Sequence, residues 1–142
     1  MVLLAGLALF APRARAAVPP DRHQRAVAAY DQAQQLRDAF ESQPEGSRRK
    51  EEYKKIIAAY SAVYRLDPAY SNTPAALASV AELYREMGRE FSSDSYFLES
   101  IRSYRFVMEQ YPQSHYARQA LFIIGEVYRQ DLEDPDEARK SF

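Results

Sequence analysis

Apolar residues recur at intervals of three and four along most of the chain. This spacing places them on one side of an α-helix, and it predicts six helices. They are expected to begin close to residues 21, 47, 73, 94, 114 and 135. Alternation of apolar and polar residues with a period of two is absent, so no strand is expected. The pattern therefore indicates an all-α fold.

Residues that favour helix ends lie between these segments. Ser114 and Asp134 suit N-cap positions, and Pro135 suits a first helical turn, where a missing N–H costs nothing. Gly88 is predicted to be the C-terminal cap of the third helix. Pro112 disfavours a helical Tyr111 and ends the fourth helix. Short turns of this kind join the helices as antiparallel neighbours.

The chain matches itself when it is shifted by 44 residues. No gap is needed, and identical residues meet at several helical positions. The pairs include Tyr60 with Tyr104, Pro68 with Pro112, Leu77 with Leu121, and Tyr84 with Tyr128. A helix-turn-helix unit that recurs at a period of about 20–50 residues indicates an α-solenoid.

The repeated positions resemble the tetratricopeptide repeat. One unit carries Leu77, Val80, Ala81 and Tyr84, then Ser100, Tyr104, Val107 and Pro112, and the next carries Leu121, Ile124, Gly125 and Tyr128. The resemblance implies a tetratricopeptide-like solenoid of antiparallel helix hairpins, in which small residues let the helices approach. Longer loops stretch the period of this family to the observed 44 residues. An unrelated helical bundle is the alternative.

The first helix of each unit lines a concave groove in this family. When the groove positions of the family are transferred one at a time to this chain, they correspond to Glu82, Arg85, Glu86, Gln119, Phe122, Glu126, Arg129 and Gln130. The resemblance implies a non-catalytic module for protein–protein interaction or scaffolding, with a protein or peptide segment in the groove. Phe122 is the anchor if it is exposed there, and part of the core if it is buried against the sixth helix.

Composition limits the chemistry of the chain. A formal net charge of −1 gives no basic face for nucleic acid. The lack of cysteine excludes disulfides, thiolate metal sites and cysteine nucleophiles. His23 and His115 belong to no metal-binding motif. Glu82 and Glu126 suggest a pair of acid–base carboxylates, but the repeat explains their recurrence better. We expect no cofactor and no catalytic residue in this chain.

A narrower resemblance concerns exported bacterial proteins. The segment YPQSHYARQALFIIGEVY is similar to repeats of envelope proteins, and residues 53–112 resemble the helical N-terminal region of exported N-acetylmuramoyl-L-alanine amidases. In those amidases a zinc-dependent catalytic domain follows. The alternative function is therefore the targeting region of a peptidoglycan-hydrolysing amidase whose catalytic domain lies beyond residue 142. Peptidoglycan or an envelope complex is then a candidate partner.

The first residues have the shape of a secretory signal. An apolar run too short to span a bilayer precedes Ala14-Arg15-Ala16, a small-x-small cleavage sequence. This predicts a signal peptide over 1–16, a helical repeat domain over 17–142, and a periplasmic or cell-envelope location. The basic start of a signal is missing, so a short buried or anchor helix is the alternative. The end at Phe142 falls inside a repeat, which predicts a truncated unit with an apolar end able to pair with a second copy.

Overall fold

The computed structural model describes residues 21–44 and 46–142, and within these ranges it holds helices and no strand. The helices are α1 (Arg22–Glu41), α2 (Lys50–Leu66), α3 (Thr73–Glu90), α4 (Asp94–Gln110), α5 (His115–Glu126) and α6 (Pro135–Ser141), and a π-helical turn, η1 (Val127–Asp131), continues α5. The predicted all-α class is confirmed. The signal peptide predicted over 1–16 lies outside the described residues.

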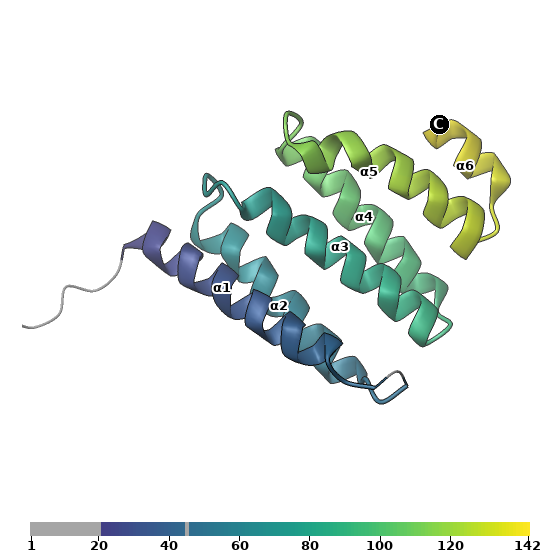
Figure 1. Cartoon of the computed structure of the whole chain (residues 1–142). Helices are drawn as coiled ribbons and strands as arrows, with labels where there is room; N and C mark the ends of the chain where they lie inside the picture. Colours follow the sequence, from purple (N-terminus) through teal and green to yellow (C-terminus); the bar gives the residue numbers. More distant parts are fainter. Residues whose placement is uncertain (1–20, 45) are drawn as a thin grey trace, which may run out of the picture.

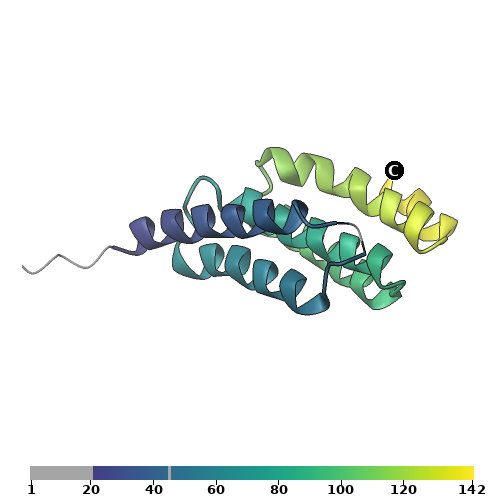
Figure 2. The ribbon, with the colours of Figure 1, turned by 60° about the horizontal axis from the view of Figure 1, so that its bottom comes forward.

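Consecutive helices pack against one another in opposite directions. The Nε of Arg22, at the start of α1, donates to the Leu66 carbonyl at the end of α2 over 3.1 Å. Within the next pair, the Ser100 hydroxyl of α4 donates to the Ala81 carbonyl of α3 over 2.7 Å. The helices follow one another in a row from α1 and α2 at one end to α6 at the other (Figures 1 and 2). None of the described helices has the length and apolar content needed to cross a bilayer.

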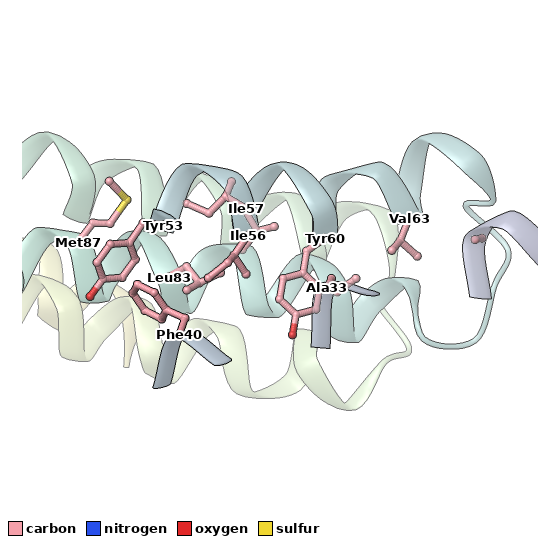
Figure 3. Close-up of a cluster of buried hydrophobic side chains, with 12 residues drawn as sticks. Ala33, Phe40, Tyr53, Ile56, Ile57, Tyr60, Val63, Leu83 and Met87 are labelled. Carbon is pink, nitrogen blue, oxygen red and sulfur yellow. The ribbon is translucent and has the colours of Figure 1, made fainter. Parts of the chain in front are cut away.

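Two clusters of buried side chains hold the row together. The first joins α1, α2 and α3 around Phe40, Tyr53, Tyr60 and Leu83 (Figure 3). The rings of Phe40 and Tyr53 meet edge to face, with centroids 4.6 Å apart. The second cluster joins α3, α4 and α5, and Tyr104 lies within it. Burial of each large apolar side chain contributes roughly 1.5–3 kcal/mol, so the row depends on contacts between successive helices.

Several repeated positions have equivalent surroundings. Tyr60 on α2 and Tyr104 on α4 are both buried, and Tyr84 and Tyr128 are both partly buried against the core. The equivalence is incomplete, because Leu77 is buried on α3 whereas its counterpart on α5 is exposed. That counterpart is Leu121.

The predicted N-caps of the last two helices are confirmed. The Ser114 hydroxyl accepts a hydrogen bond from the Ala117 N–H over 3.0 Å. The Asp134 carboxylate accepts one from the Glu137 N–H, also over 3.0 Å. Both bonds satisfy backbone donors that the first helical turn leaves without a partner.

The predicted cap at Gly88 is wrong. Helix α3 continues to Glu90, and the residue with left-handed backbone is Ser92, with φ 47°. The Ser93 N–H then donates to the Gly88 carbonyl over 3.0 Å, which closes the helix end. Gly88 instead permits a close approach of helices, because a Cβ there would lie 2.5 Å from the ring of Phe97 on α4.

Replacing Gly88 by alanine tests this close approach. We expect Gly88→Ala to lower the free energy of unfolding by about 1–3 kcal/mol, because the Phe97 ring must move. Helix propensity alone favours alanine by about 1 kcal/mol. Urea unfolding measures the change, and the loss should be smaller when Gly88→Ala is made in a Phe97→Leu background. A more stable single variant would show that the ring does not constrain this position.

Candidate functional site

One side of α3 carries a row of charged residues. Glu82, Arg85, Glu86 and Arg89 are spaced by three and four, so they share one face of the helix. This face meets Arg37 of α1 on one side and Asp131 of η1 on the other. These six residues are called the charged face below.

Arg37 connects α1 to α3 through three carboxylates. Its Nη2 donates to Glu86 over 2.7 Å, and its Nε donates to Glu41 of its own helix over 2.5 Å. Its Nη1 lies 3.8 Å from Glu82, too far for a hydrogen bond, and this nitrogen is buried without a partner. Glu82 is therefore the least neutralised of the three carboxylates.

Asp131 connects η1 to α3. Here one carboxylate lies between two guanidinium groups, whereas at Arg37 one guanidinium lies among three carboxylates. The oxygens of Asp131 lie 2.6 Å from the Nε of Arg85 and 3.0 Å from the Nε of Arg89. Its side chain is only 7% exposed. The π-helical turn places it there, because the Leu132 N–H donates to the Val127 carbonyl, five residues back, and this widens the helix.

An open hollow of about 250 Å³ lies between α3 and α5 on this face. Tyr104 of α4 and Ile123 of α5 line it together with the four charged residues of α3. Tyr104 is 3% exposed, and burial raises the pKa of its hydroxyl, with Glu82 adding to the effect. The hollow is thus lined by four charged side chains, one aliphatic side chain and one tyrosine.

Glu82 is held near the mouth of the hollow. Burial raises the pKa of its carboxyl, the Arg37 guanidinium opposes this rise, and the carboxylate of Glu86 adds to it. Its side chain nevertheless remains 53% exposed, so the carboxylate can reach a bound molecule. Glu82 therefore combines an accessible position with incomplete neutralisation.

The structure brings together three of the eight residues predicted for the groove. Glu82, Arg85 and Glu86 lie on the charged face and line the hollow. The others lie elsewhere on α5 and η1. Gln119 is exposed, Phe122 is 61% exposed beside Phe142 with ring centroids 5.7 Å apart, and Glu126 pairs with Arg129 and Gln130.

Sequence reasoning missed five residues of this site: Arg37, Arg89, Tyr104, Ile123 and Asp131. Arg89 could have been predicted from the sequence, because it lies four residues after Arg85 on the same helical face. Asp131 could not, because a regular helical period of 3.6 residues misplaces residues within a π-helical turn. Arg37 lies on α1, outside the 44-residue repeat.

Metal chemistry has no support among the residues that the structure describes. No group of three or more His, Cys, Asp or Glu there could hold a metal ion. His23 lies 2.8 Å from an oxygen of Asp67, and this contact joins the start of α1 to the turn after α2. His115 begins α5 and is exposed.

Comparison with models of protein families, with curated proteins and with solved structures gives no match to this chain.

Replacing Arg37 by methionine tests the link between α1 and α3. We expect Arg37→Met to lower the free energy of unfolding at pH 7 by about 1–2 kcal/mol, because Glu82 and Glu86 lose their shared cation while the apolar stem is kept. The pKa of Glu82 is already raised, and losing Arg37 raises it further. The deficit should therefore be full at neutral pH and shrink as the pH falls towards about 4, where the Glu82 carboxyl binds a proton in both the folded and the unfolded state.

Urea unfolding at pH 7, 6, 5 and 4 gives the comparison. Arg102→Met is the matched control, because Arg102 forms an exposed pair with Glu99 on α4. That control should change the stability by less than about 0.5 kcal/mol. A deficit in Arg37→Met that does not depend on pH would show that the carboxylates are not its cause.

Proposed function

We propose that this chain is a non-catalytic protein-interaction module of tetratricopeptide type, and that the charged face binds an extended segment of another protein. The observation that carries the proposal is the hollow between α3 and α5, which opens on a face built by α1, α3 and η1. In the tetratricopeptide family, which this chain resembles, the first helix of each unit lines the ligand groove. Helices α1, α3 and α5 are the first helices of the three hairpins.

The presence of further hollows near the end of α3 supports an extended ligand. A second hollow of about 280 Å³ lies between Arg48, Tyr53 and the end of α3, and a third of about 330 Å³ lies between Gly88 and Asp131. Arg89 lines all three hollows. Several hollows that share Arg89 suit several successive side chains of one segment better than a single compact molecule.

The charges on this face are already arranged before a ligand arrives. Arg37, Arg85 and Asp131 each hold partners on another helix or turn, and their side chains are less than one-fifth exposed. A ligand therefore meets fixed groups and has fewer flexible side chains to order, which lowers the entropic cost of binding. The exported, envelope location and the alternative role in a peptidoglycan amidase remain predictions from the sequence.

A peptide selection tests the proposed function. A displayed library of random twelve-residue peptides, selected on the whole chain, should yield binders whose addition shifts the NMR signals of α1, α3 and α5. Arg89→Ala should weaken such a binder at least about fivefold, or about 1 kcal/mol, because buried arginines at interface centres contribute on this scale. Asp131 keeps Arg85 as a partner in this variant, so the fold should persist.

Arg102→Ala provides the matched control for that measurement. Arg102 is also an exposed arginine on a helix, but it pairs with Glu99 and lies away from the charged face. Its replacement should leave the dissociation constant unchanged. Binders that shift only α2 and α4 would place the interaction on the other side of the row and would refute the proposal.

A further inference from the structure

We infer that the hollow between α3 and α5 receives a cationic side chain, arginine or lysine, from the bound segment, and that Glu82 is its acceptor. This inference rests on the proposed function and names the chemistry of one position in the ligand. It follows from which charges on this face already have partners, and from what lies at the base of the hollow.

The guanidinium groups of the charged face already have carboxylate partners. Arg85 and Arg89 line the hollow, and both bind Asp131, at 2.6 Å and 3.0 Å. Arg37 binds Glu86 and Glu41 through two nitrogens. An acidic side chain in the hollow would lie next to the carboxylates of Glu82 and Glu86, which also line it, and their repulsion disfavours an anion.

The carboxylates on the same side are not fully neutralised. Among the residues that the structure describes, Arg37 is the single cation that pairs with Glu41, Glu82 and Glu86. Glu82 has only the 3.8 Å contact, although its side chain is 53% exposed at the hollow. A cation placed there gains a charge-assisted hydrogen bond without breaking an existing one.

The base of the hollow suits the rest of such a side chain. Ile123 and the buried ring of Tyr104 provide apolar surface for the methylene groups of arginine or lysine. Tyr104 lines the same hollow, and its hydroxyl can accept a second hydrogen bond from the cationic head. The volume of about 250 Å³ corresponds to about eight water molecules, which is enough for one long side chain.

Three pools of synthetic nonapeptides test the inference. Each pool has one fixed central residue, arginine, glutamate or norleucine, between randomised neutral residues, with both termini blocked. The pools are passed over the immobilised whole chain, and the retained peptides are quantified by mass spectrometry. The arginine pool should be retained at least about fivefold more than the norleucine pool, and the glutamate pool less than either.

Two variants separate the hollow from the general charge of the chain. Glu82→Gln removes the negative charge but keeps the shape of the side chain, so the advantage of the arginine pool should disappear. Glu109→Gln makes the same change of charge at an exposed position of α4, outside the three hollows, and should keep the advantage. Circular dichroism and thermal unfolding of both variants verify that they are folded.

The possible outcomes distinguish the two proposals. Equal or better retention of the glutamate or norleucine pool, or an arginine advantage that survives Glu82→Gln, overturns the inference and leaves the proposed function standing. Failure of every pool to be retained above a blank surface overturns the proposed function itself.

Discussion

Each helix of this chain must share its apolar side with the helices before and after it, and the rest of the structure follows from that constraint. Helix α3 shows it most clearly, because it packs against α2 on one side and α4 on the other. Its buried residues fill both contacts. The positions outside these contacts include Glu82, Arg85, Glu86 and Arg89, which share one face of the helix. The part of the charged face that α3 provides therefore lies outside its two packing contacts.

Much of the fold could be predicted from the sequence because it depends on local periodicity. Spacings of three and four identified the helices, and Ser114 and Asp134 identified two of their starts. Gly88 shows where this reasoning ends. Glycine favours both helix ends and close helix contacts, and only the ring of Phe97, brought in by the α3–α4 contact, decides between them. The role of this glycine therefore depends on a tertiary contact, and no local sequence pattern encodes it.

The candidate site was predicted less well for the same reason. The repeat register identified Glu82, Arg85 and Glu86 because they lie on one regular helix. Asp131 ends a π-helical turn, and Tyr104 reaches the site from α4, the second helix of its hairpin. Which charge has a partner depends on distances between helices, and no spacing along the chain encodes those. The sequence therefore predicted the face, whereas the structure showed which of its charges are available.

The way in which Arg37 joins α1 to α3 affects how this junction responds to salt. Neighbouring hairpins meet through an apolar contact between α2 and α3, and through ion pairs between α1 and α3. Apolar contacts are not weakened by added salt, whereas partly exposed ion pairs weaken because mobile ions screen them. The α1–α3 side of this junction is therefore more sensitive to salt than the α2–α3 side.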